Sequence, residues 1–411
     1  MIINKVVCGD AIIELRSFPK NSIDSIVTDP PAGISFMGKK WDDNKGSRDN
    51  WIKWLSEIMT EAKRVLKPGG HALVWALPRT SHWTGFALEN AGFEVRDIVH
   101  HLFGSGFPKS MDISKAIDKQ AGAERMIESI RWKRTANEKY GNGRGTNLQT
   151  LNTIPTTPEA KQWSGWGTAL KPAVECWWLV RKPISEKTVA MNVVKWGTGG
   201  LNIDGCRVGT KEDMNPNDFD DSKRSAPKFS GKYNNGNIGQ YLNRVGNVPD
   251  GRFPANLIHD GSDEVLEGFA KAGVSKSIRA PRGGTSPNPM SWGEERKDGE
   301  EIAGHNDSGT PARFFYCAKP SKAERDAGLS GNNHPTVKAQ ALMQYLIKLI
   351  TPPGGIVLDP FAGSGSTLVA ANKLGHPYIG IEIDPDYCKI AEKRLVADLN
   401  GNYSLDEFNT T

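Results

Sequence analysis

Residues Gly355–Thr367 read GIVLDPFAGSGST, and this stretch is the clearest indication of the fold class. An apolar run ends at Asp359, a turn with Gly363 and Gly365 follows, and helix-forming residues begin near Ser366. Glycine lets the backbone approach a ligand closely, and the first turn of a helix presents free N–H groups. The stretch therefore predicts a strand–turn–helix unit that binds a ligand at the carboxyl end of its strand.

Strands and helices alternate on both sides of this unit. Apolar runs predict strands at 23–28, 71–76, 94–100, 355–359 and 378–382. Helical spacing predicts helices at 50–65, 86–92, 339–350, 366–374 and 385–397. Such alternation is typical of a parallel sheet with crossover helices, so we predict a doubly wound, Rossmann-like α/β fold.

A further acidic residue, Glu382, ends the predicted strand after the turn, where a carboxylate is well placed to bind ribose hydroxyls. The plain interpretation is a Rossmann-type nucleotide site. The G-x-G-x-x-G spacing is absent from this turn, which disfavours NAD, and without G-K-[ST] the turn is not a P-loop.

A second stretch, Ile26–Phe36, reads IVTDPPAGISF. Its apolar strand delivers Asp29 to the carboxyl edge of the sheet, where α/β proteins bind their ligands. Pro30 and Pro31 then hold the turn rigid and keep backbone carbonyls pointing outward. A lone D-P-P is a weak signal, and its meaning comes from its pairing with the glycine-containing turn.

Composition excludes several classes of protein. The chain has 411 residues, with 52 Lys and Arg residues against 47 Asp and Glu residues, which permits nucleic-acid binding without requiring it. No apolar run approaches the roughly 18 residues that cross a bilayer, so we expect no membrane association. The five cysteines lie far apart without a C-x-x-C pair, which disfavours a metal site or a disulfide framework and fits a reducing cytoplasm.

Two short basic stretches, Arg125–Arg134 (RMIESIRWKR) and Lys276–Arg282 (KSIRAPR), are either solvated faces or contacts for phosphates. Between residues 185 and 330 apolar periodicity is weak, and Asn, Gly, Asp, Pro and Lys are frequent. This composition predicts a long, loop-rich insertion. The pair His100-His101 is expected to be structural, because adjacent strand residues point to opposite faces.

Together the two motifs resemble those of the DNA amino-methyltransferases, which transfer a methyl group from S-adenosylmethionine to adenine N6 or cytosine N4. The family's catalytic motif, D/S/N-P-P-Y/F/W, is matched by Asp29-Pro30-Pro31, and its cofactor motif, F-x-G-x-G, by Phe361-Ala362-Gly363-Ser364-Gly365. The catalytic motif comes first here, which is the order of the β class. Four further stretches are similar to a phage and prophage branch: Gly33–Asp42, Gly104–Ser110, Gly165–Pro172 and Arg313–Asp326.

The resemblance implies a set of site residues. His334-Pro335-Thr336-Val337-Lys338 is similar to the family's H-P-T-x-K element near the methionine end of the cofactor, and the Asp of Gly9-Asp10 would face the cofactor adenine. The implied cofactor-binding residues are Asp10, His334, Thr336, Lys338, Asp359, Phe361, Ala362, Gly363, Ser364, Gly365 and Glu382, with no metal. Lys171–Glu175 is similar to a K-P-A-x-E element and is a candidate to line the pocket.

The resemblance also implies an organisation and a setting. Residues 1–184 form the catalytic half, 185–330 a target-recognition insertion, 331–397 the cofactor-binding half and 398–411 a tail. The cofactor is S-adenosylmethionine, S-adenosylhomocysteine is the product, and double-stranded DNA is the partner. A homodimer and a partner restriction endonuclease both occur in the family. The expected location is the cytoplasm of a bacterial or phage-infected cell.

The family's chemistry explains the catalytic residues. Asp29 and the Pro30 carbonyl accept bonds from an exocyclic amine, which draws its lone pair toward the sulfonium methyl for in-line transfer. The amine is inaccessible inside a duplex, so the base is flipped out, and an aromatic residue after the prolines stacks on it. Here that fourth position is Ala32. Either the chain is an engineered variant that has lost an aromatic residue, tyrosine in the simplest case, or another ring such as Phe36 or Trp41 supplies the stacking.

Three functions remain open. The first is methylation of DNA, with adenine N6 favoured over cytosine N4 because aspartate at the head of the motif is commoner in the family's adenine enzymes. The second is methylation of RNA or of a protein side-chain amide. The third is a disabled chain that binds DNA and cofactor without turnover because of Ala32.

Overall fold

A computed structural model of the chain describes residues 2–34, 42–104, 106, 110–134, 147–209, 251–277, 307–318 and 338–399. The chain divides into two compact units, one formed by Met1–Gly104 with Val174–Thr411 and one by Ser105–Ala173. Across the described ranges, no helix is both long enough and apolar enough to span a membrane. Four of the predicted site residues lie outside the described residues: Phe36, Trp41, His334 and Thr336. The stretches Gly33–Asp42, Gly104–Ser110, Lys276–Arg282, Arg313–Asp326 and His334–Lys338 lie partly outside them.

The larger unit is built on a nine-stranded sheet with the order β1-β13-β12-β2-β3-β7-β4-β8-β11. Its strands are β1 (Lys5–Cys8), β2 (Ile23–Thr28), β3 (Leu66–Ala76), β4 (Glu94–Leu102), β7 (Val174–Arg181), β8 (Leu257–His259), β11 (Tyr316–Cys317), β12 (Val357–Asp359) and β13 (Tyr378–Glu382). Each neighbouring pair is parallel except for the two pairs that β7 makes, with β3 and with β4.

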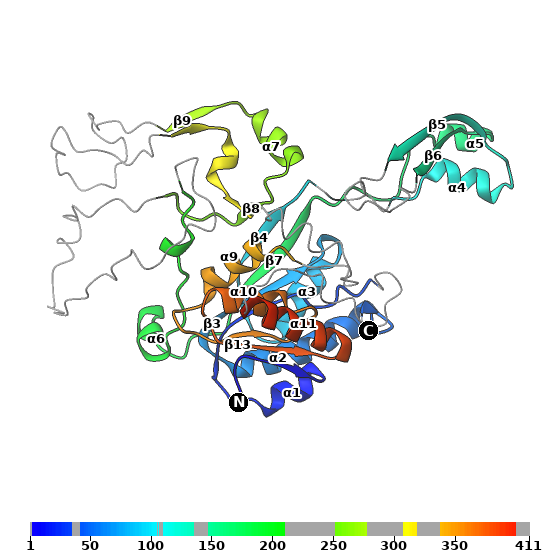
Figure 1. The fold of residues 1–411 in the computed structure, drawn as a ribbon. Helices are drawn as coiled ribbons and strands as arrows, with labels where there is room; N and C mark the ends of the chain where they lie inside the picture. Colours follow the sequence, from blue (N-terminus) through cyan, green and yellow to red (C-terminus); the bar gives the residue numbers. More distant parts are fainter. Residues whose placement is uncertain are drawn as a thin grey trace. The chain divides into compact units, whose positions relative to one another are not determined.

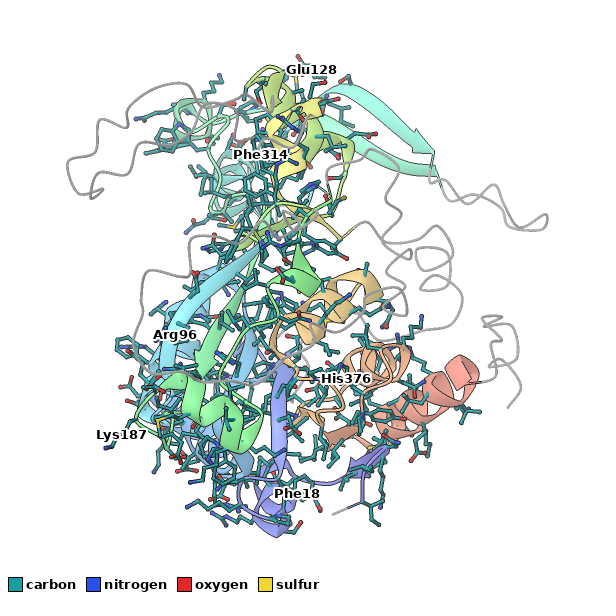
Figure 2. The ribbon with its side chains drawn as sticks, turned by 90° about the vertical axis from the view of Figure 1, so that its left-hand side faces the viewer. Phe18, Arg96, Glu128, Lys187, Phe314 and His376 are labelled. Carbon is teal, nitrogen blue, oxygen red and sulfur yellow. The ribbon has the colours of Figure 1, made fainter. Side chains whose placement is uncertain are left out.

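Helices cover both faces of the sheet, because successive strand residues point to opposite sides. In β2, Ile26 joins a core cluster with Leu55, whereas its neighbour Val27 joins a second cluster with Leu368. The first cluster is covered by α1 (Ala11–Ser17), α2 (Arg48–Val65) and α3 (Ser81–Asn90), and Phe18, labelled in Figure 2, also packs there. The second cluster is covered by α9 (Gln340–Ile350), α10 (Ser366–Lys373) and α11 (Pro385–Leu399), which lie together in Figure 1. The predicted doubly wound α/β fold is confirmed.

The prediction of a parallel sheet is wrong at β7, since Val174–Arg181 is not among the predicted strands. This strand lies between β3 and β4 and runs antiparallel to both. Six of its eight residues are apolar, and five are buried, so the strand lacks the alternation that marks a half-exposed strand. Its pairing is decided by partners far away in the sequence.

The described parts of 185–330 add elements to the larger unit. α6 (Val189–Trp196) is joined to β3 by Asn192, whose Nδ2 donates to the Pro68 carbonyl at 2.8 Å. β8 and β11 extend the sheet beyond β4. The remaining described elements here are η4 (Asp204–Cys206), α7 (Asp263–Ala270), β9 (Ser275–Ser277), β10 (Asp307–Gly309) and η7 (Pro311–Phe314). The target-recognition role of this segment stays a prediction.

The smaller unit, Ser105–Ala173, was not expected as a separate body. It contains α4 (Ile113–Gln120), β5 (Met126–Arg134), β6 (Asn147–Ile154) and α5 (Pro158–Gln162). β5 and β6 pair antiparallel in a sheet of their own, with Met126 opposite Ile154 and Arg134 opposite Asn147. This two-stranded sheet is called the ribbon below.

Candidate active site

The two sequence motifs meet at the carboxyl edge of the sheet. β2 and β12 are parallel neighbours, so the residues that follow Thr28 and those that follow Asp359 leave the sheet side by side. Thr28 Oγ1 donates a hydrogen bond to Asp359 Oδ1 at 2.6 Å. The D-P-P motif and the glycine-containing turn therefore face one ligand-binding region, although most of the chain separates them in sequence.

Asp29 takes part in a cluster of charged side chains, together with Lys338 and Glu175. The Lys338 Nζ lies 3.4 Å from Asp29 Oδ2 and 3.1 Å from Glu175 Oε1. Lys338 comes from the segment before α9, whereas Glu175 comes from β7. One ammonium group thus holds two carboxylates, and the cluster carries a net negative charge when all three groups are ionised.

The two carboxylates differ in proton affinity. Burial raises the pKa of Asp29 to about 6, with Lys338 lowering it and Glu175 raising it further. Burial also tends to raise the pKa of Glu175, but Lys338 and His101 lower it to about 2. For Lys338, burial lowers the pKa, yet the two carboxylates outweigh burial and raise it. Glu175 is therefore the permanent anion, and Asp29 is the carboxylate whose charge changes near neutral pH.

Aromatic rings border this cluster. The Lys338 Nζ lies 4.1 Å from the centroid of the Trp75 ring and 6.0 Å from that of Trp177, distances that allow cation–π attraction. His101 stands opposite Glu175 in the β4–β7 register, and its Nδ1 is 3.7 Å from Glu175 Oε2. The indole nitrogens of both tryptophans and both ring nitrogens of His101 are buried, and none has a hydrogen-bond partner within the described residues. The cluster thus lies beside buried ring nitrogens that form no hydrogen bond within the described residues.

The loop that follows Pro31 is held at its start by two hydrogen bonds. Gly33 has φ +71°, its N–H donates to Asp42 Oδ1 at 2.8 Å, and an added Cβ would lie 2.7 Å from the Trp51 ring. The Thr80 hydroxyl donates to the Ala32 carbonyl at 3.3 Å. Glycine is therefore required at position 33, and the backbone on either side of it is held by Thr80 and Asp42.

The turn after β12 packs closely against α11. Gly365 has φ +80°, caps α10 without a side-chain hydrogen bond, and lies so near α11 that an added Cβ would be 2.9 Å from the Ala391 Cβ. Asp359 Oδ1 accepts from the Phe361 N–H at 3.0 Å, and burial raises the pKa of Asp359 to about 6. The first turn of α10 therefore presents backbone N–H groups next to two acidic side chains, Asp359 and Glu382.

The residues at this turn fit S-adenosylmethionine. Glu382 Oε2 accepts from the Gly363 N–H at 2.7 Å and Oε1 from the Asp384 N–H at 2.9 Å. The Ile383 N–H also bonds to this carboxylate, which has about four lone-pair positions and so can still accept from a ribose hydroxyl. The Oε1 of Gln340 is buried and has no partner within the described residues, although its Nε2 donates to the Ser366 carbonyl at 3.1 Å. A buried acceptor of this kind is suited to a ligand with polar donors.

Other predicted cofactor residues have structural contacts. Asp10 caps α1, and its Oδ1 accepts from the N–H groups of Ile12 and Ile13 at 3.0 and 3.2 Å. The Ser364 hydroxyl accepts from Arg394 Nη1 at 2.9 Å, so this side chain is directed toward α11. Ala362 donates its N–H to the Ile381 carbonyl at 2.9 Å. Their contacts with cofactor stay predictions.

Glu175 is among the residues that the sequence predicts to line the pocket, whereas Trp75, Trp177 and the contact of His101 are not predicted. The K-P-A-x-E element was the available signal for Glu175. Glu175 contacts His101 of β4 and Lys338 of the segment before α9, and no pattern in the sequence indicates that these segments are neighbours. His101 is 8% exposed and lies beside the charged cluster, and its expected structural role stays a prediction.

Replacing Glu382 with glutamine is expected to weaken S-adenosylmethionine binding about ten- to hundredfold, because hydrogen bonds to a charged acceptor contribute about 1.5–3 kcal/mol. Isothermal titration with S-adenosylmethionine and S-adenosylhomocysteine measures this. Asp386→Asn, at an exposed position in the first turn of α11, is the matched control. Equal affinities for the Glu382 variant and the unaltered chain would contradict the role of Glu382.

Comparison with known proteins gives a family match over most of the chain. Residues 23–393 match the model of the N6_N4_Mtase family, described as DNA methylase. The type II methyltransferase M2.DpnII of Streptococcus pneumoniae is 44% identical over 81 residues, which are 20% of this chain and 29% of that protein. The DNA adenine methyltransferase YhdJ of Escherichia coli K12 is 47% identical over 75 residues, 18% of this chain and 25% of that protein. The chain thus matches less than a third of the length of these relatives.

Among solved structures, the cytosine-N4-specific PvuII DNA methyltransferase is similar to 97% of this chain, and 93% of its own chain is covered. The sequence identity is 15% and the TM-score is 0.45. The family match, by contrast, extends from the start of β2 into α11 and so includes both motifs that meet at the sheet edge. The chain therefore belongs to the N6_N4_Mtase family of DNA methylases, whose methyl donor is the predicted S-adenosylmethionine.

Proposed function

We propose that this chain transfers a methyl group from S-adenosylmethionine to an exocyclic amine of a DNA base, with Asp29, Pro30 and Pro31 as catalytic residues. The observation that carries the proposal is the position of Asp29, at the strand end beside Asp359 and bound to Lys338. Membership in the DNA methylase family supports the same reaction.

The residues of the chain act mainly by binding and orienting the amine. Ionised Asp29 accepts one N–H bond and the Pro30 carbonyl accepts a second, which directs the nitrogen lone pair out of the ring's conjugation. When bound, S-adenosylmethionine supplies an electrophilic methyl group on its sulfonium. Lys338 holds one Asp29 oxygen in place, and the other oxygen remains available for the amine.

Adenine N6 is the proposed target, and cytosine N4 is the second candidate. The aspartate at the head of the motif favours adenine, and the relative YhdJ carries the name of an adenine methyltransferase. An amine buried in a base pair cannot reach Asp29, so the target base is flipped out of double-stranded DNA.

We further propose a modification role in a bacterial or phage-infected cell. The stretch Gly33–Asp42 supports the phage-like branch, and the name of M2.DpnII as a type II methyltransferase supports a restriction-modification setting. A homodimer, a partner endonuclease and a cytoplasmic location belong to the same proposal.

The proposal is tested with labelled methyl transfer to unmethylated duplex DNA, followed by digestion to nucleosides. Label on N6-methyladenine supports the favoured target, whereas label on N4-methylcytosine supports the second candidate. RNA and protein substrates in parallel reactions test the other acceptor classes. The proposal fails if neither this chain nor its Ala32→Tyr variant labels any DNA.

The pH dependence of transfer follows from Asp29. Because its pKa is raised to about 6, the carboxylate is present above that pH and is lost as the pH falls through it. We expect methyl transfer under single-turnover conditions to decrease about tenfold per pH unit well below pH 6. A rate that is independent of pH between 5 and 8 would contradict the role of ionised Asp29.

A further inference from the structure

The ribbon of the smaller unit exposes large apolar side chains. Met126 is 69% exposed, Ile127 56% and Ile130 45%, all on β5. Glu128, labelled in Figure 2, is also exposed on this strand. A two-stranded ribbon is marginally stable by itself, and proteins seldom leave several such side chains uncovered without a binding role. The exposed residues therefore indicate a contact surface for a partner.

The charge of the smaller unit indicates what that partner is. Ser105–Ala173 contains 11 Lys and Arg residues and six Asp and Glu residues, so these 69 residues have a formal net charge of +5. The other 342 residues contain 41 of each kind and have no net charge. The excess of positive charge in the whole chain is thus concentrated in the smaller unit, and it is complementary to a polyanion.

The ribbon has a firmly held base. Asp118 of α4 is fully buried, and its carboxylate accepts from Arg125 Nη1 at 2.6 Å and from the backbone N–H groups of Thr156 and Thr157 at 3.1 and 3.0 Å. Arg125, just before β5, also donates to the Thr153 hydroxyl of β6 at 2.8 Å. One buried ion pair therefore joins α4 to β6 and to the residue that precedes β5.

We propose that the ribbon is a DNA-binding element that enters the major groove of double-stranded DNA. The major groove admits a two-stranded β-ribbon, phosphates attract its positive charge, and apolar side chains such as Ile127 suit the thymine methyl group. The sequence places three basic residues, Arg131, Lys133 and Arg134, in the last part of β5. This inference rests on the proposed function and adds a second contact surface to the predicted insertion at 185–330.

The test uses the full chain with Arg131, Lys133 and Arg134 changed to glutamine. Binding to a fluorescent 30-base-pair duplex is measured by anisotropy between about 50 and 300 mM salt. We expect affinity at low salt to fall about tenfold or more and the slope of log affinity against log salt to become less steep by about 2–3. Affinity for S-adenosylmethionine should not change.

The matched control changes three exposed lysines of the larger unit, Lys5, Lys20 and Lys53, to glutamine. Equal losses in the two variants, or no loss in the ribbon variant, would overturn the proposal. If the triple variant unfolds by circular dichroism, its three single variants are each expected to reduce the slope by about 1. Ribbon-dependent DNA binding without methyl transfer to any DNA would support this inference while contradicting the proposed function.

Discussion

Replacing Ala32 with tyrosine is expected to raise methyl transfer to duplex DNA about five- to 150-fold. A base that stacks on an aromatic side chain gains about 1–3 kcal/mol, and alanine offers no ring. The Ala32 carbonyl accepts from the Thr80 hydroxyl, and Gly33 next to it adopts φ +71°, so the backbone around position 32 is held by contacts that the substitution leaves in place. The measurement is labelled methyl transfer with both chains under identical conditions.

The matched control is Ala32→Leu, which adds volume without an aromatic face and should leave the rate close to that of the alanine chain. Asp29→Ala in the tyrosine background should abolish the gain, because the amine loses its acceptor. Equal rates for the alanine and tyrosine chains would mean that another ring stacks on the base. Phe36→Ala and Trp41→Ala variants would then identify it.

Changes at Lys338 and Glu175 are expected to shift the pH profile in opposite directions. Lys338 lowers the pKa of Asp29 and Glu175 raises it. In Lys338→Met, Asp29 should therefore lose its proton only at higher pH. The acidic side of the profile of rate against pH (the acid limb) should then move above pH 6. In Glu175→Gln, the acid limb should move below pH 6, because the negative charge that opposes ionisation of Asp29 is gone.

The lysine variant is also expected to be slower at its optimum by about ten- to hundredfold, because a hydrogen bond between charged groups contributes about 1.5–3 kcal/mol. The measurement is the single-turnover rate from pH 5 to 9, in the tyrosine background if the parent chain is slow. Lys338→Arg retains the positive charge and serves as the control, with an acid limb near that of the parent. Limbs that move in the same direction, or not at all, would show that the cluster does not control Asp29.

Much of the fold could be predicted from local sequence. β2 and β13 end at the predicted residues, Thr28 and Glu382, and β12 ends at Asp359 as predicted. These strands are marked by apolar runs that end in a turn, and such a signal is contained within a few neighbouring residues. Because ligand sites in doubly wound folds lie at the carboxyl ends of the strands, the acidic residues there could be assigned to one edge of the sheet from the sequence alone.

The pairing of β7 and the separate unit Ser105–Ala173 could not be predicted in this way. An antiparallel strand inserted between two parallel neighbours depends on hydrogen bonds to β3 and β4, which are remote in sequence. That register alone brings Glu175 opposite His101. The boundary of the smaller unit likewise depends on which residues contact each other, and composition is a poor guide to contacts.

The fold class and the family follow from the sequence, because both depend on short motifs and on the order of strands and helices, and the same motifs predict the residues that carry the chemistry. The electrostatics of the site, by contrast, depend on the tertiary structure. The pKa of Asp29 depends on its burial and on Lys338 and Glu175, which come from distant segments. Coulomb energy depends on distances in space and on the exclusion of water, and the spacing of residues along the chain determines neither of them.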